Sequence, residues 1–229
     1  MTVSPRRRAP RRSLADTAYE RIYRRIMTLE YEPGRRLEEK DLVAELGIGR
    51  TPVREALLRL GADFMVESHP SRGFLVRSIT LQNTRAAFAA LRILELGVAG
   101  LAVRRHVTEA LPAMAEANHA VAQAVAANDV VALVEANAVF HQRFAECSGN
   151  DYLIQALHKV RCEINRLAYL SFRQELDPGR SLAEHYRSVV AHHDQLVRHL
   201  GERDGEALAA TVSEHVEAFQ RRILLYMAT

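Results

Sequence analysis

Apolar residues recur at helical spacing on both sides of Gly47, within the segment 37–60. Glycine accepts the left-handed backbone that the end of a helix often needs, so Gly47 predicts a tight turn. Thr51 followed by Pro52 is typical of an N-cap and the first turn of the next helix. The pattern therefore predicts a helix, a glycine turn and a second helix.

The second helix carries arginines, and the residues after it form two short apolar runs. Arg50 and Arg54 lie near the N-terminal end of this helix, outside its apolar stripe. Residues 64–66 and 74–76 flank a glycine-bearing polar loop that holds Arg72, which predicts a two-stranded wing. A recognition helix enters the major groove of DNA with its N-terminal residues toward the bases, so arginines at this end favour that role. A helical hairpin with a solvated arginine face is the alternative, but turn, cap, arginines and wing agree in order.

The residues before this segment predict a supporting helix and a basic tail. Apolar residues recur at helical spacing from a cap at Ser13 or Asp16 to about Glu30. Residues 1–12 hold five arginines and two prolines. We therefore expect a disordered tail that adds weak, nonspecific attraction to DNA.

Long alanine-rich segments replace the short elements after residues 78–80. Their breaks are short and polar, and long helices with short connections form an antiparallel bundle. The expected fold is mainly α, with a winged helix-turn-helix over 13–78 and an all-α bundle over 79–229. Five or six helices are expected in the bundle, at about 81–106, 109–127, 129–147, 151–174, 180–201 and 204–227.

Charge and composition agree with this division. Residues 1–78 hold 16 basic against 11 acidic side chains, and the remainder holds 15 against 17, so the DNA-facing part is the positive one. No run of about 18 apolar residues is present, which excludes a membrane span, and no signal peptide precedes the first helix. Cys147 and Cys162 are too few for a disulfide framework and fit a reducing cytoplasm.

Four polar residues of the expected bundle are candidates for a metal site. Asn137 and His141 are four residues apart, so they project from one face of their helix. His193 and His215 lie 11 residues before and after Asp204, so a hairpin at that turn brings them to the same level. Three imidazoles and an amide oxygen suit zinc, nickel, iron or manganese and leave coordination positions open. A single helix histidine is more often an ordinary core or surface residue, but three with this symmetry favour a metal.

Two other classes of protein stay open. His193-Asp194, with His141 upstream and Asp204 downstream, loosely matches the ligand pattern of metal-dependent phosphohydrolases. Against this, Asp204 lies in the hairpin turn, far from the expected meeting point of the histidines. A structural DNA-coating protein with a dimerising bundle and no ligand is the other alternative.

The segment 47–57, GIGRTPVREAL, resembles the recognition-helix signature of GntR-family bacterial transcription regulators. The segments EPGRRL at 32–37 and SRG at 71–73 resemble the lead-in and the wing of that family. Gly49 is a departure, because the family usually has serine there, and a hydroxyl for phosphate contact is missing. The resemblance and the pattern together predict DNA contacts from Lys40, Arg50, Thr51, Arg54, Arg72 and Gly73.

The helical part resembles the FCD ligand-sensing domain of one GntR subgroup. Metal-binding members carry Asp-x-x-x-His on one helix and a histidine on each of the last two, which implies Asn137, His141, His193 and His215 here. Asn137 replaces the usual aspartate, so a lower metal affinity is expected. His185 and His192 compete for the third position, but only His193 keeps the spacing. Arg92 is expected to reach the effector's carboxylate, unless it pairs with Glu95 on the surface.

The expected protein is a cytoplasmic transcription regulator and not an enzyme. It is expected to repress, and to be a homodimer that binds a palindromic operator in double-stranded DNA. A divalent transition metal in the bundle is expected to hold a small carboxylate effector. The acid, the metal and the operator sequence do not follow from these residues.

Overall fold

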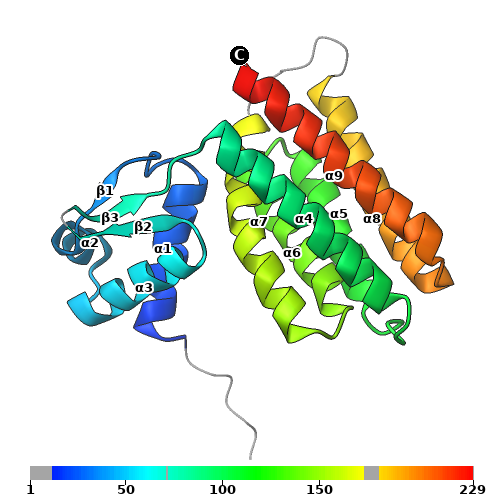
Figure 1. Ribbon diagram of the computed structural model, residues 1–229, viewed down its shortest axis with the longest axis horizontal. Helices are drawn as coiled ribbons and strands as arrows, with labels where there is room; N and C mark the ends of the chain where they lie inside the picture. Colours follow the sequence, from blue (N-terminus) through cyan, green and yellow to red (C-terminus); the bar gives the residue numbers. More distant parts are fainter. Residues whose placement is uncertain (1–11, 71, 173–180, 229) are drawn as a thin grey trace, which may run out of the picture.

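A computed structural model describes residues 12–70, 72–172 and 181–228, which form a winged helix beside a helical bundle (Figure 1). The fold is mainly α, with an N-terminal winged helix-turn-helix and a C-terminal antiparallel bundle, as expected from the sequence. The tail expected at 1–12 lies outside the described residues, apart from Arg12.

The winged helix contains three short helices and a three-stranded sheet. The strands lie in the order β1-β3-β2, and both pairs are antiparallel. The sequence pattern did not indicate β1, and β2 begins at Val66 instead of Phe64, whose positive φ of 60° interrupts the extended backbone. The elements are α1 Leu14–Met27, β1 Arg36–Leu37, α2 Glu39–Leu46, α3 Arg50–Ala62, β2 Val66–His69 and β3 Gly73–Val76.

The ends of these helices follow local chemistry. Ser13 caps α1 in a reciprocal capping box with Asp16, and α1 ends before the predicted Glu30 because Leu29 has a φ of 60°. Gly47 ends α2 with a left-handed φ of 66°, as predicted. The predicted cap of α3 is wrong: the N-cap is Gly49, and Thr51 is already inside the first turn. Glycine has no side chain to cap with, so the first turn of α3 lacks a side-chain cap bond.

The core of the winged helix joins α1 and α3 to the wing. Ile22, Ile26, Leu57 and Met65 are each fully buried in one cluster. Burial of such side chains stabilises a fold by about 1.5–3 kcal/mol each. Cys162 of the bundle belongs to the same cluster, so the winged helix packs against the bundle through apolar contact.

Six antiparallel helices make the bundle, close to the ranges predicted (Figure 1). Phe88, Phe140, Phe144 and Val212 are fully buried in its centre. Side chains of Thr80, Asp129, Asn150 and Ser181 cap four of the helices. The helices are α4 Leu81–Ala102, α5 Leu111–Ala126, α6 Val130–Glu146, α7 Asp151–Ser171, α8 Leu182–Glu202 and α9 Gly205–Ala228.

Helix α7 lies between the rest of the bundle and the winged helix (Figure 1). Asn165 Nδ2 donates to the Tyr23 hydroxyl of α1 at 3.0 Å. The fully buried Arg166 donates from one terminal nitrogen to the Arg77 carbonyl at 2.6 Å. One helix therefore contacts both the DNA-binding part and the interior of the bundle.

Across the described residues, no helix combines the length and the apolar character that crossing a membrane requires.

Candidate DNA interface and metal centre

All six residues predicted to contact DNA are exposed. Arg50 and Arg54 lie one turn apart at the start of α3, and both face Glu39 of α2. Arg50 Nε lies 2.8 Å from Glu39 Oε2, and an Arg54 terminal nitrogen lies 3.8 Å from Glu39 Oε1. The Glu39 side chain is only 15% exposed, so one partly buried acid of α2 lies within ion-pair distance of both arginines. The pattern of the sequence did not assign this role to Glu39.

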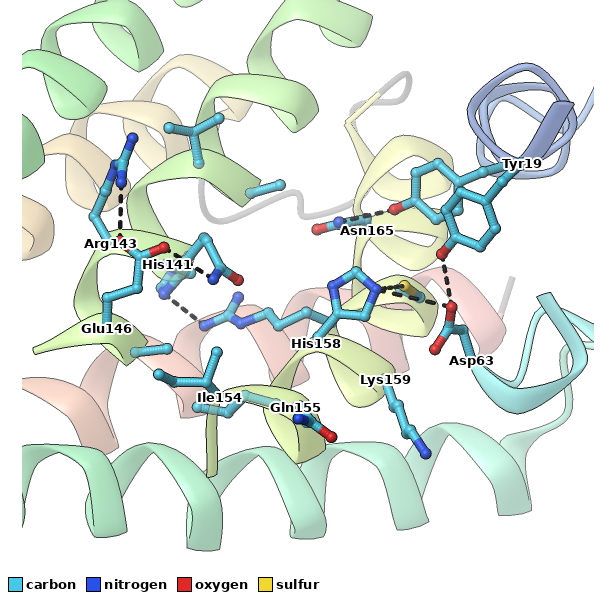
Figure 2. A pocket seen from close by; sticks show the side chains of 18 residues that line it. Tyr19, Asp63, His141, Arg143, Glu146, Ile154, Gln155, His158, Lys159 and Asn165 are labelled. Atoms are coloured by element: carbon cyan, nitrogen blue, oxygen red, sulfur yellow. Dashed lines mark hydrogen bonds and ion pairs between the residues drawn. The ribbon is translucent and has the colours of Figure 1, made fainter. Parts of the chain in front are cut away.

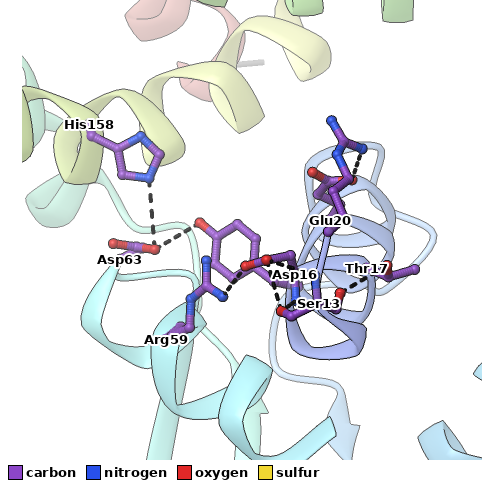
Figure 3. A network of polar contacts seen from close by, with 9 residues as sticks. Ser13, Asp16, Thr17, Glu20, Arg59, Asp63 and His158 are labelled. Atoms are coloured by element: carbon purple, nitrogen blue, oxygen red, sulfur yellow. Dashed lines mark hydrogen bonds and ion pairs between the residues drawn. The ribbon is translucent and has the colours of Figure 1, made fainter. Parts of the chain in front are cut away.

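Arg59, on the same helix, holds α3 against α1 (Figure 3). One of its terminal nitrogens lies 2.7 Å from Asp16 Oδ1, and its guanidinium lies over the Tyr19 ring at 4.7 Å. The hydrogen bond from Arg59 lowers the pKa of Asp16 to about 2, with further help from Ser13. Arg59 therefore joins α3 to α1 within the winged helix.

Arg72 is exposed in the turn of the wing, beside Gly73. Gly73 has a φ of 70°, which side-chain-bearing residues rarely adopt, although a Cβ there would meet no neighbour. Glycine is therefore required by the backbone of the turn and not by crowding.

Inside the bundle, His141 of α6, His193 of α8 and His215 of α9 converge. One nitrogen from each ring lies within 4.8 Å of the others. His141 Nε2 and His215 Nε2 are 3.2 Å apart, and two ligands at about 2.1 Å from one ion are separated by ~3.0–3.4 Å. Within the described part of the chain, His193 Nε2 and His215 Nδ1 have no hydrogen-bond partner. The spacing of the two Nε2 atoms, together with the unpartnered buried Nε2 of His193, fits a divalent transition metal.

Burial keeps these imidazoles neutral. It lowers the pKa of His141 to about 3, and burial followed by the neighbouring histidines lowers the pKa values of His193 and His215 well below the ordinary value. Neutral imidazole is the form that binds a metal, so all three side chains are available as ligands near neutral pH.

Residues around the cluster orient two of the rings. His193 Nδ1 lies 2.9 Å from Asn118 Oδ1, and Asn118 Nδ2 donates to Asp194 Oδ1 at 2.7 Å. His141 Nδ1 lies 3.2 Å from a carboxylate oxygen of Glu95, which is 2% exposed. A partner at one ring nitrogen determines which nitrogen is left for a metal.

The other histidines considered from the sequence lie outside this cluster. His185 is buried against Phe172, and the ring of His192 lies 5.7 Å from that of His215 without entering the cluster. Asn137 is 9% exposed and lies one turn before His141 on α6. The hairpin between α8 and α9 therefore selects His193, because its spacing from the turn matches that of His215.

Arg92 does not reach the cluster, contrary to the expectation. It lies on the outer face of α4 and pairs with Glu217 at 2.6 Å, with its side chain 46% exposed. The alternative pair with Glu95 is also wrong, because Glu95 faces the bundle interior. The guanidinium at the cluster belongs to Arg161 of α7, which contacts Glu95 and lies 2.6 Å from His141 Nδ1. The helical spacing of charged residues alone gave no signal for Arg161.

Asp204 has a structural role and is far from the histidine cluster. It is exposed in the turn before α9, where its carboxylate accepts a bond from the Ala207 amide at 3.0 Å. The phosphohydrolase pattern therefore lacks its downstream aspartate. A winged helix with an exposed arginine-bearing helix, joined to a helical bundle, is the architecture of a DNA-binding transcription regulator.

The chain belongs to the GntR family of bacterial regulatory proteins, in the subgroup that carries an FCD domain. The GntR family profile matches residues 14–76, and the FCD domain profile matches residues 86–218. The relatives of this chain are transcription regulators and not enzymes.

Two curated relatives cover nearly the whole chain. The HTH-type transcriptional repressor RspR of Escherichia coli K12 is 23% identical over 93% of this chain and 90% of its own. The Nta operon transcriptional regulator of Aminobacter aminovorans is 22% identical over 86% of this chain and 89% of its own.

Solved structures share the fold. The chain is similar to McbR/YncC of E. coli, with a TM-score of 0.78, 22% identity, and coverage of 95% of this chain and 99% of that one. A GntR regulator from Rhodococcus sp. RHA1 has a TM-score of 0.71, 21% identity, and coverage of 92% and 97%.

Proposed function

We propose that this regulator is a cytoplasmic homodimer that represses transcription and that releases its operator in response to a small organic acid held at a bound metal. The convergence of His141, His193 and His215 carries this proposal. The name of the relative RspR, a repressor, supports the direction of control. Two-fold symmetry supports a palindromic operator, because it presents two recognition helices to matching half-sites.

The metal would be held by the three histidines, with Asn137 as the fourth ligand. For His141, Nδ1 lies against Glu95 and Arg161, and Nε2 faces His215 as the nitrogen that would bind the metal. Zinc, nickel, manganese and iron all accept such ligands. When bound, the ion would supply an electrophilic centre for the carboxylate of the effector.

Elemental analysis after metal loading tests this site. Alanine at His193 or His215 is expected to abolish metal uptake and lower the melting temperature, while His119→Ala, at an exposed histidine of α5, leaves uptake unchanged. Asn137→Asp is expected to tighten metal binding, because an anionic oxygen replaces a neutral one. A wild-type protein that takes up no metal rejects the proposal.

The exposed N-terminal end of α3 supports sequence-specific DNA recognition by Arg50 and Arg54. A binding site selected from a pool of random duplexes provides the probe. Alanine at either arginine is expected to weaken binding to that site by about 1–3 kcal/mol. Arg85→Ala, at an exposed arginine of α4, is the matched control. Unchanged affinity in both α3 variants would reject this helix as the recognition helix.

A further inference from the structure

A cavity of about 730 Å³ lies between the winged helix and the bundle (Figure 2). It extends from His141, Arg143 and Glu146 at one end to Tyr19 and Asp63 of the winged helix at the other. Pockets for small organic ligands have volumes of roughly 300–1,000 Å³. Because its wall includes both parts of the protein, a ligand here would touch the DNA-binding part directly.

This cavity is separate from the interior of the histidine cluster. His141 belongs to both, but His193 and His215 do not line the cavity. The ring of His141 presents Nε2 to His215 on one side and Nδ1 to Arg161 on the other. A ligand can therefore lie in the cavity without contact with His193 or His215.

Two residues that line the cavity each have a buried polar atom without a hydrogen-bond partner in the described part of the chain. These atoms are Asn165 Oδ1 and Arg161 Nε. Asn165 is 6% exposed, and its amide nitrogen is already used by the Tyr23 hydroxyl. An unpaired buried polar group is costly, so the free acceptor of Asn165 matches a ligand that carries a hydrogen-bond donor.

Charge and ring contacts define the rest of the ligand. Tyr19 and Tyr23 are stacked with their planes 6° apart and give the cavity an aromatic wall. Their neighbour Asp63 is already engaged, with its Oδ2 2.7 Å from the Tyr19 hydroxyl and 3.8 Å from His158 Nε2. Three of the basic lining residues are paired, Arg143 with Glu146, His158 with Asp63 and Arg161 with Glu95. Lys159 adds a further positive charge to the lining. This charge favours an anion, and the guanidinium of Arg161 is the planar donor group that suits a carboxylate.

We propose that this cavity is a second effector site, which binds an aromatic carboxylic acid carrying a hydroxyl or amino donor. Its carboxylate would face Arg161, and its donor would face Asn165. This site goes beyond the metal-linked effector proposed above and does not depend on it. A bound acid would join α1 to α7 and so favour one placement of the winged helix relative to the bundle.

Tryptophan fluorescence tests this site on the full-length protein. The chain has no tryptophan, so Gln155→Trp, at an exposed residue of the cavity rim, is the only such reporter. The probe is 4-hydroxybenzoate, titrated in the presence of a metal chelator. Saturable binding is expected, at least tenfold weaker for methyl 4-hydroxybenzoate, which lacks the charge, and weaker for benzoate, which lacks the donor.

Matched variants in the same background locate the site. Ala138→Phe fills the cavity and is expected to abolish binding, whereas Ala115→Phe, at an exposed alanine of α5, is expected to leave it unchanged. Asn165→Leu is expected to remove the preference for 4-hydroxybenzoate over benzoate, and it gives a second test if Ala138→Phe does not fold. Circular dichroism melting identifies the variants that fold.

Three outcomes would overturn the proposal. They are the absence of saturable binding, binding unaffected by Ala138→Phe, and loss of binding in His193→Ala, which would place the probe at the histidine cluster. Binding that persists in His193→Ala while metal uptake is lost supports it. The failure of one site is thereby distinguishable from the failure of the other.

Discussion

Replacing Asn118 by leucine tests whether the residue that orients His193 sets the affinity for metal. Asn118 Oδ1 lies 2.9 Å from His193 Nδ1, and both residues are buried. Leucine has a similar size but cannot accept the proton on Nδ1, so His193 is no longer held with Nε2 toward the other two histidines. The change therefore acts on the orientation of a metal ligand without removing the ligand.

Two magnitudes follow from this geometry. Loss of such an orienting partner weakens metal binding by about 10–100-fold, which is roughly 1.4–2.7 kcal/mol. The variant also leaves His193 Nδ1 and the Val190 carbonyl without the bonds that Asn118 supplies. An unsatisfied buried group costs about 1–3 kcal/mol, and each kcal/mol lowers the melting temperature by roughly 2–4 °C in a protein of this size.

Zinc titration against a chromogenic chelator measures the first effect, and calorimetric melting without metal measures the second. Gln123→Leu is the matched control. Gln123 is exposed on the same helix, and its side chain contacts His119, which is also exposed. Zinc affinity equal to that of the wild type in Asn118→Leu would refute the orienting role of this hydrogen bond. Equal losses in both variants would point to a general effect on α5.

Three other changes test the DNA-binding part and its link to the bundle. Alanine at Lys40 or Arg72 is expected to weaken binding to all duplexes evenly. The affinity of the wild type for DNA is expected to fall steeply between about 50 and 200 mM salt. An affinity, measured by anisotropy titration, that stays constant over that range would contradict the phosphate contacts. Gly47→Val forces a β-branched residue into a φ of 66° and is expected to lower the free energy of unfolding by roughly 1–2 kcal/mol. Gly49→Ser, at a φ of −62°, is expected to stabilise α3 slightly through a cap bond. Equal urea midpoints for the two variants would be inconsistent with this difference. The interaction with Asp63, followed by that with Cys162, raises the pKa of His158 to about 10. The protonated side chain therefore contributes stability that is fully present below its unfolded pKa of 6.5 and is lost as pH rises through about 10. His158→Gln is expected to reduce the fall in melting temperature between about pH 6 and 10, and an unchanged pH profile would exclude this interaction.

The winged helix was largely predictable because its signals are local. The turn at Gly47 and the exposed positions of Arg50 and Arg54 depend on residues within a few positions of one another. The cap of α3 was predicted wrongly, since Gly49 adopts the extended backbone of an N-cap without any side-chain bond to indicate it. Strand β1 was missed because its two residues are extended only through pairing with β3.

The sequence by itself determined that the second part is a bundle of six long helices, since apolar periodicity and short polar breaks are enough to define them. It also indicated the meeting of His193 and His215, because both lie at equal spacing from one hairpin turn. Only the tertiary structure decided that Arg161, and not Arg92, contacts Glu95 beside His141. Glu95 and Arg161 lie on different helices and are 66 residues apart in the chain. Which side chains meet across such a distance depends on the rotation and crossing of packed helices, and no local pattern encodes those quantities.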